Sequence, residues 1–279
     1  MRIHYILLVC VFLLTSCDKT KISWDSGEKE NLEECKVNLY VENSGSMEGY
    51  MHDGFEFKDA VFGYVTAINK YVDDTRFFYI NSKIVPNRIS LENLTGSFNA
   101  AAFKAGGGDR SSTNLAAMFK MILKEQQKNT VSVFVSDCIL DLPKGAAKNY
   151  FINNQIAIEA IVSKKLKKQK DLTFVVFRLM SRFYGKYYNS TGSSTVNAMR
   201  PYYVFLIGNG SLVSQLMRKV PLADIPNAKV TSMVAYINNH VPAMTITNST
   251  GRLFKKNKCN LLPEKGSDNY RIKILADLS

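Results

Sequence analysis

Five side chains that carry hard oxygen ligands stand at three separate places in the sequence. Glu42, Ser44 and Ser46 lie in the tract ENSGSMEG. Thr113 follows the flexible tract GGGDRSS, and Asp137 comes just after the apolar run VSVFV. Hydroxyl and carboxylate oxygens suit Mg²⁺, Mn²⁺ or Ca²⁺, and these side chains are too few to complete the coordination shell of such a cation. The residue types therefore predict a divalent cation site with one coordination position open.

Each of these residues also has an ordinary structural interpretation. Ser-Gly-Ser is common in turns, Thr113 is suited to cap a helix, and Asp137 is suited to accept hydrogen bonds at the end of a strand. A site is favoured because all of these residues fall, in order, where a strand ends or a helix begins.

The elements that position these residues can be read from the apolar pattern. The tract KVNLYVE predicts a buried strand over residues 36–42 that leads into the Ser/Gly loop. Apolar residues at helical spacing predict a helix over 57–72, and the tract RFFYI predicts a strand over 76–80. Residues 81–112 have mixed polarity and predict a loop.

Strands and helices continue to alternate up to about residue 220. We expect helices over 114–127, 150–168 and 210–220, and strands over 131–135, 172–179 and 202–207. This alternation predicts an α/β fold with a doubly wound, mostly parallel sheet and helices on both faces. Ligands bind such sheets where loops leave the carboxyl ends of the strands, which is where the oxygen-bearing residues fall.

After Pro221 the pattern changes to short extended segments separated by turn residues. They are VTSMVAYI, AMTITN, CNLL and YRIKILADL, and they predict a small β-rich appendage over residues 221–279. The chain stops within a few residues of the last expected strand, which leaves the completeness of this appendage open.

The site motifs resemble the metal-ion-dependent adhesion site (MIDAS) of the von Willebrand factor A (VWA) family. That site reads Asp-x-Ser-x-Ser, then a distant Thr, then a distant Asp. Here Glu42-Asn43-Ser44-Gly45-Ser46 is similar to the first motif, Ser112-Thr113-Asn114-Leu115 to the second and Val135-Ser136-Asp137 to the third. The resemblance covers roughly residues 36–220.

The resemblance implies a VWA-like domain that binds a protein partner through a divalent cation. Ser44, Ser46 and Thr113 would supply oxygens to Mg²⁺, Mn²⁺ or Ca²⁺, directly or through water. Glu42 and Asp137 would supply charge and hydrogen bonds, and an acidic side chain of the partner would fill the open position. The departure from the family is Glu42, where Asp is usual. The extra methylene moves the carboxylate by more than a bond length, which bears on the choice of metal.

The N-terminus has the features of a lipoprotein signal. An apolar run from Ile6 to Leu14 is long enough for a signal peptide and too short to span a bilayer. The tract that ends at Cys17, Leu-Thr-Ser-Cys, resembles a bacterial lipobox, which implies that residues 1–16 are removed and that Cys17 is lipidated. The alternative is an ordinary signal peptide with a coincidental cysteine.

The residues after Cys17 are expected to form a spacer. Residues 17–35 are polar and lack periodicity. Only Asp18 is acidic before two lysines, whereas surface-exported lipoproteins of some bacteria carry an acidic run there. We therefore expect a lipid-anchored protein of the bacterial cell envelope, at the outer membrane, with the periplasmic side favoured over the cell surface as the alternative.

The formal net charge of +12 has no nucleic-acid motif beside it, so no nucleic-acid partner is expected. The densest basic run, within residues 164–170, is interpreted as the solvated end of an amphipathic helix, with a phosphate or lipid-headgroup patch as the alternative.

Three cysteines remain besides those of the leader and lipobox: Cys35, Cys138 and Cys259. A Cys35–Cys259 disulfide and separate buried thiols are both left open. Cys138 stands where the VWA family often has Gly, and we expect a small buried residue there rather than a nucleophile.

The sequence is compatible with three functions, of which it favours the first: a metal-dependent binding module without enzymatic activity. The second is a metal-free scaffold whose site has degenerated through Glu42. The third is a hydrolase in which His52 or His240 activates a serine, which lacks the Gly-x-Ser-x-Gly frame. The aromatic segment 183–188 is expected to be a β-hairpin with cross-strand aromatic pairs, with an exposed contact loop as the alternative.

Overall fold

The computed structural model describes residues 32–52, 54–87, 98–111, 113–140, 147–189 and 192–237, and the strands 243–249, 252–256, 258–262 and 272–277. The leader, Cys17, most of the spacer and His240 lie outside the described residues. No helix among the described residues is long and apolar enough to cross a membrane.

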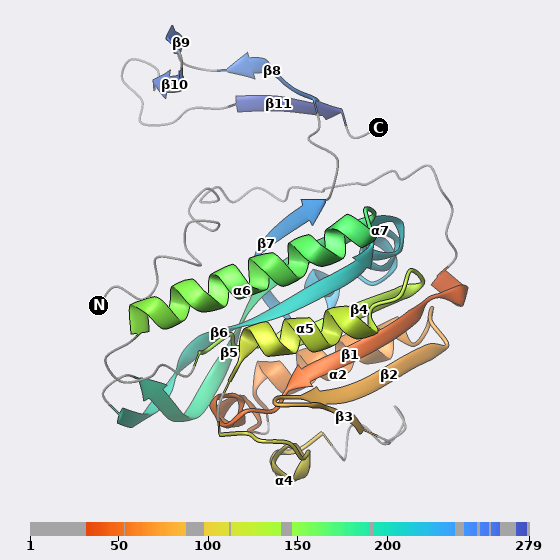
Figure 1. Ribbon diagram of the computed structural model, residues 1–279, viewed down its shortest axis with the longest axis vertical. Helices are drawn as coiled ribbons and strands as arrows, with labels where there is room; N and C mark the ends of the chain where they lie inside the picture. The colour runs from red at the N-terminus through yellow and green to blue at the C-terminus, as the bar shows by residue number, and fades with distance from the viewer. Residues whose placement is uncertain are drawn as a thin grey trace. The chain divides into compact units, whose positions relative to one another are not determined.

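A seven-stranded sheet in the order β3-β2-β1-β4-β6-β5-β7 forms the centre of the fold (Figure 1). Its strands are β1 Lys36–Glu42, β2 Asp74–Ile80, β3 Ile84–Asn87, β4 Thr130–Ser136, β5 Leu172–Asn189, β6 Gly192–Asn209 and β7 Lys229–Ile237. Strand β1 pairs in parallel with β2 and with β4, and the other neighbours are antiparallel. The predicted α/β doubly wound fold is confirmed, with a parallel centre and antiparallel flanks.

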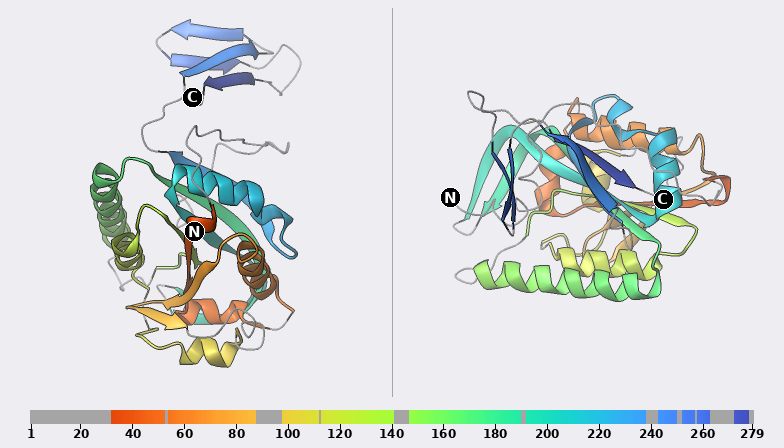
Figure 2. Two further views of the ribbon diagram at one scale, coloured as in Figure 1. Left: turned by 90° about the vertical axis from the view of Figure 1, so that its right-hand side faces the viewer. Right: turned by 90° about the horizontal axis from the view of Figure 1, so that it is seen from above.

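Helices cover both faces of this sheet (Figure 2). One face carries α2 (Glu56–Ile68) and α7 (Gly210–Lys219), and the other carries α5 (Leu115–Glu125) and α6 (Ala147–Lys168). Each face has its own apolar cluster, and β4 is buried at every position between them. Burial on both faces explains why the central strands read as nearly continuous apolar runs.

Among the described residues of segment 81–112, for which the sequence predicts a loop, the structure has two short elements. They are β3 and the helix α4 (Ala100–Ala105). Strand β3 pairs with β2 as an edge strand, and α4 is held by the cap of Asn99 and by the buried ring of Phe103. Both elements depend on tertiary contacts more than on local pattern. The described residues also include the 3₁₀ helices η1 Leu32–Glu34, η2 Gly45–Tyr50 and η4 Leu222–Asp224.

Strands β5 and β6 form one long hairpin, paired from Leu172↔Asn209 to Asn189↔Gly192. The aromatic segment 183–188 therefore lies in a hairpin as predicted, but its partners over residues 193–198 are not aromatic, so the prediction of cross-strand aromatic pairs is wrong. The connection after Asn189 is too short for a crossover, so β6 returns antiparallel and lies beside β4.

The predicted start of the β-rich appendage at residue 221 is wrong for its first segment. Strand β7 pairs with β5 along Thr173–Met180 and is an edge strand of the main sheet. A separate compact unit follows from Asn239. It contains the antiparallel pairs β8 (Ala243–Ser249) with β11 (Ile272–Asp277) and β9 (Arg252–Lys256) with β10 (Lys258–Leu262).

Candidate metal centre

The predicted site residues meet at the edge where the parallel strands end. Glu42 is the last residue of β1, and its register partner in β2 is Ile80, so these strands end together. Asp137 directly follows β4. Glu42, Ser44, Thr113 and Asp137 are all buried, and Ser46 is half-buried.

Thr113 is tied to Glu42 and does not cap a helix. Its hydroxyl donates to Oε1 of Glu42 at 2.9 Å. The N-cap of α5 is the next residue, Asn114, whose side chain accepts from the amide of Ala117. The N-cap interpretation of Thr113 is therefore wrong, and its hydroxyl is oriented by the carboxylate.

Ser136 is a site residue that sequence reasoning missed as such. Its hydroxyl donates to Oε2 of Glu42 and accepts from the amide of Cys138 at 2.8 Å. The signal in the sequence was a hydroxyl residue immediately before Asp137, but only the fold shows that it faces Glu42. The longer side chain at position 42 thus reaches two hydroxyl donors, one for each oxygen.

Ser44 and Ser46 present their hydroxyls to one another, with 3.0 Å between the two Oγ atoms. Ser44 is the N-cap of η2 but makes no side-chain capping hydrogen bond. Two oxygens bound to one octahedral cation at about 2.1 Å and at right angles also lie about 3.0 Å apart. The spacing therefore fits adjacent ligand positions as well as a hydrogen bond.

Asp137 has an oxygen that is not used in the protein. Its Oδ1 accepts from the amide of Ile139 at 3.0 Å, whereas the buried Oδ2 accepts no hydrogen bond from the described residues. Burial and, next, the negative charge of Glu42 raise the pKa of Asp137 to about 8. The amide of Ile139, the nearby hydroxyl of Ser46 and the charge of Arg200 oppose this rise.

Glu42 is in the same electrostatic position. Burial raises its pKa, against the lowering effect of hydrogen bonds from Ser136, Ser44 and Thr113. Two adjacent buried carboxylates disfavour joint ionisation unless a positive charge compensates them. The fold therefore gathers negative charge and hydroxyl oxygens at one point, which are the groups that a hard cation binds.

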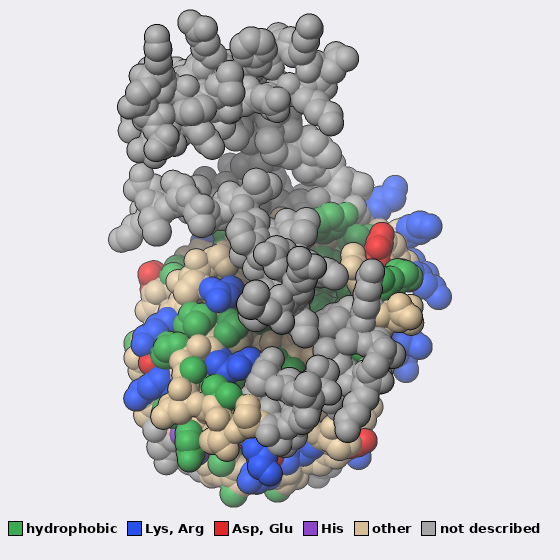
Figure 3. All heavy atoms as spheres, turned by 90° about the vertical axis from the view of Figure 1, so that its left-hand side faces the viewer, with side chains coloured by type: hydrophobic (Ala, Val, Ile, Leu, Met, Phe, Trp, Pro, Cys, Tyr) green, Lys and Arg blue, Asp and Glu red, His purple; other side chains and the backbone are tan. Residues whose placement is uncertain are grey.

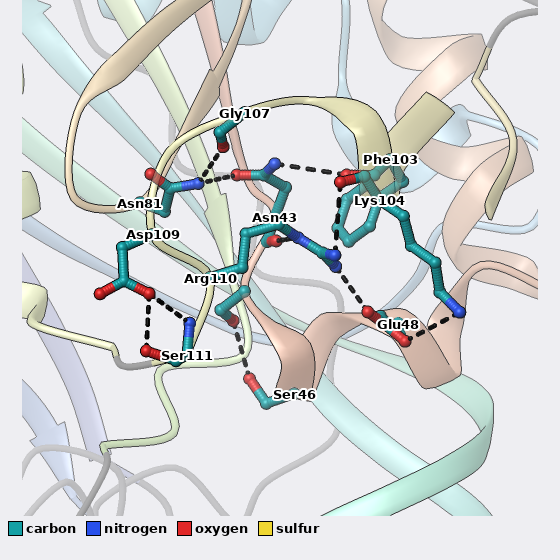
Figure 4. A network of polar contacts seen from close by, with 11 residues as sticks. Asn43, Ser46, Glu48, Asn81, Phe103, Lys104, Gly107, Asp109, Arg110 and Ser111 are labelled. Carbon is teal, nitrogen blue, oxygen red and sulfur yellow. Dashed lines mark hydrogen bonds and ion pairs between the residues drawn. The ribbon is translucent and has the colours of Figure 1, made fainter. Parts of the chain in front are cut away.

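A network around the loop holds this arrangement in place (Figure 4). Asn81 donates to Oδ1 of Asn43 at 2.7 Å. Arg110 donates to the carbonyl of Asn43 and to Glu48, both at 2.6 Å. Gly108 has a φ of +78°, and a Cβ there would lie 1.9 Å from Oδ1 of Asn81. Gly108 therefore packs closely against Asn81, which bonds to Asn43 in the loop after β1.

His52 does not contact the serine hydroxyls by any hydrogen bond among the described residues. Its Nε2 lies 2.9 Å from the carbonyl oxygen of Tyr184. No group of three or more His, Cys, Asp or Glu side chains suited to a metal occurs in the part of the chain that the structure describes. The present set has two carboxylates and depends on hydroxyls for its other oxygens.

Comparisons with known proteins give no relative. No family model, no curated protein and no solved structure matches the chain.

Proposed function

We propose that this chain is a membrane-anchored binding module that captures an acidic side chain of a protein partner through a divalent cation. The cation is Mg²⁺, Mn²⁺ or Ca²⁺, held by Ser44, Ser46, Thr113 and Asp137. The observation that carries the proposal is the buried Oδ2 of Asp137, which accepts no hydrogen bond from the described residues, in a carboxyl group close to the hydroxyl of Ser46. A buried carboxylate oxygen without a donor is costly unless a cation or water meets it.

The hydrogen bonds of Glu42 leave the other residues suited to bind a cation. A hydroxyl has one proton and two lone pairs. Because the Thr113 hydroxyl uses its proton in the hydrogen bond to Glu42, both of its oxygen lone pairs remain available to a cation. Glu42 then contributes charge and orients Thr113 without being a direct ligand. Its side chain, longer than the usual Asp, therefore does not have to fit the metal–oxygen distance.

The protein's oxygens leave a coordination position for the partner. A cation of this class takes at least six oxygen ligands, and the four side chains that hold it here supply fewer, so a carboxylate of the partner can complete the shell. This matches the binding mode that the VWA resemblance implies. The proposed anchor is Cys17, which agrees with the lipobox-like sequence at the N-terminus.

A metal-free scaffold is the second candidate, and one observation favours it. Both oxygens of Glu42 already accept hydrogen bonds, from Thr113 and Ser136. The site is therefore partly satisfied without a cation.

A thermal melt of the full-length chain in detergent separates the two candidates. With EDTA replaced by a cation at a hundredfold its Kd, the folded state gains about 2.7 kcal/mol. We expect this rise in Tm for the wild type and for the control Asp73→Ala, which alters an exposed residue. Asp137→Ala should abolish it. A wild-type Tm that does not respond to any of the three cations would favour the scaffold.

The anchor has its own test. Wild-type chain expressed in a bacterial host should incorporate labelled palmitate and sediment with membranes. Cys17→Ser should lose the label, and a variant that still carries it would exclude Cys17 as the lipidated residue.

A further inference from the structure

The β5–β6 hairpin extends past the rest of the sheet. The register of β4 with β6 stops at Ser136↔Tyr203, and that of β7 with β5 stops at Met180. We call residues 181–200 the arm; its described residues, 181–189 and 192–200, pair only with each other. The arm projects on the side where β1 ends, next to η2 (Figure 1).

The inner face of the arm is fixed against the loop that carries the site serines. The buried ring of Phe183 meets Tyr50 edge-on at 4.9 Å between centroids. A Cβ on Gly185 would lie 2.9 Å from Cα of Gly49. The hydroxyl of Tyr50 donates to the carbonyl of Pro201 at 2.7 Å. The arm therefore has a defined position beside the candidate metal centre.

The base of the arm carries a positive charge. The guanidinium of Arg200 lies 5.5 Å from the centroid of the Phe183 ring, and Phe183 packs on Tyr50 of the 3₁₀ helix that carries Ser46. A partner bound at the metal centre is thus adjacent to the arm.

The outer face of the arm is exposed and lacks negative charge. Tyr184 and Met199 are 48% and 44% exposed, and Lys186 is exposed beside them. Residues 172–209 contain Arg and Lys but no Asp or Glu. Figure 3 shows the side of the molecule on which β1 ends, with basic side chains among hydrophobic ones and few acidic ones.

We propose that the outer face of the arm is a second contact surface for the same partner, which binds an acidic peptide segment that flanks the metal-binding carboxylate. The class of occupant rests on the proposed function, because an acidic partner is what the metal centre takes. Lys186 and Tyr184 make the contact: the ammonium attracts carboxylates, and the ring supplies area at low entropic cost.

The test uses full-length chain in detergent and a fluorescein-labelled glutamate homopeptide, read by anisotropy with and without cation. Lys186→Glu should weaken binding by about fivefold, the effect of about 1 kcal/mol. Tyr184→Ala should also weaken it. The matched control is Lys70→Glu, an equal charge change at an exposed residue near the start of β2, at the opposite edge of the sheet. It should bind like wild type, and a glutamine homopeptide should not bind.

The outcomes separate this proposal from the metal-dependent function. If cations raise the Tm but Lys186→Glu binds the peptide like Lys70→Glu, the arm proposal fails and the metal site stands. If no cation raises the Tm but Lys186→Glu weakens peptide binding and Lys70→Glu does not, the arm proposal stands and the metal site fails. The arm proposal is overturned if the wild type does not bind the peptide. It is also overturned if Lys186→Glu still binds the peptide and loses only the binding to anionic phosphatidylglycerol vesicles.

Discussion

The hydroxyl of Thr113 donates to Oε1 of Glu42, although 71 positions separate the two residues in the chain. Ser136 donates to the other oxygen from 94 positions away. The glutamate thus links the end of β1 to the end of β4 and to the segment before α5. A shorter aspartate at position 42 would have to draw one of these donors closer or lose it.

Thr113→Val tests whether this hydrogen bond sets up the site. Valine keeps the shape but removes the proton donor, so the free energy of unfolding should fall by about 1–2 kcal/mol in EDTA. The cation-dependent rise in Tm should disappear. Thr113→Ser keeps the hydroxyl and should retain the cation response; equal responses in the valine and serine variants would contradict the assigned role.

Asp137→Asn should stabilise the protein in EDTA at pH 8. The folded-state pKa of about 8 lies above the ordinary value of about 3.9, so folding favours the protonated form. The stabilisation from Asp137 is complete below about pH 4 and is lost as the pH rises to about 8.

The asparagine variant lacks this titration. Its Tm should exceed that of wild type by a margin that widens from pH 5 to pH 8, while its response to cations is lost. A wild-type Tm that does not fall relative to the variant over that range would refute the raised pKa.

Cys138 adopts a left-handed backbone with φ of 55°. Glycine adopts this conformation without strain, whereas a β-branched residue is strained by about 1–3 kcal/mol. Urea denaturation should therefore rank Cys138→Gly at or above Cys138→Ala and both above Cys138→Val. The opposite ranking would show that side-chain packing outweighs backbone strain here.

Glu56 should stabilise the fold at neutral pH and not in acid. Burial by itself raises the pKa, but the ammonium of Lys229 at 2.6 Å, the amide of Arg182 at 2.8 Å and the Arg182 side chain lower it to about 2. The stabilisation is present above the ordinary value of 4.5 and is lost as the pH falls towards 2.

Glu56→Gln should therefore be less stable than wild type at pH 7 by about 1–3 kcal/mol. The gap should close near pH 2. The control Glu159→Gln, at an exposed position of α6, should show no gap at either pH. A constant Glu56→Gln gap across the pH range would mean that charge is not the cause.

Gly49→Ala tests the contact between η2 and Phe183 of the arm. The new Cβ would lie 2.3 Å from Cε2 of Phe183, a clash that should cost about 1–3 kcal/mol. Gly45→Ala in the same 3₁₀ helix meets only the Arg110 carbonyl at 3.7 Å and should be tolerated. Adding Phe183→Leu should recover part of the loss in Gly49→Ala, and a double-mutant cycle without coupling would place the strain elsewhere.

The central strands could be predicted because a strand that is buried on both faces has a continuous apolar sequence. Strand β1 has the predicted bounds, and β4 extends the predicted run by one residue at each end. The segment 81–112 has no such apolar pattern. Its four-residue strand β3 includes Pro86, and its six-residue helix α4 is held by Phe103 packing on Tyr79.

The prediction of parallel strands was wrong beyond α6, where β5, β6 and β7 pair antiparallel. The apolar runs of β5 and β6 read like buried parallel strands, and the aromatic segment between them read as either a hairpin or a contact loop. Periodicity reports how buried a strand is and does not report its direction. The short connection after Asn189 decides the direction, and it places the arm beside the site.

Strand burial and residue type are both local properties, so the amino-acid pattern alone places hydroxyl and carboxylate side chains at the ends of buried strands. The folded chain was needed to show that Thr113 bonds to Glu42 and does not cap a helix, that Ser136 joins them, and that Oδ2 of Asp137 accepts no hydrogen bond from the described residues. Those pairings follow from the register of β1 between β2 and β4, which sets which donors lie near each buried oxygen across long stretches of chain.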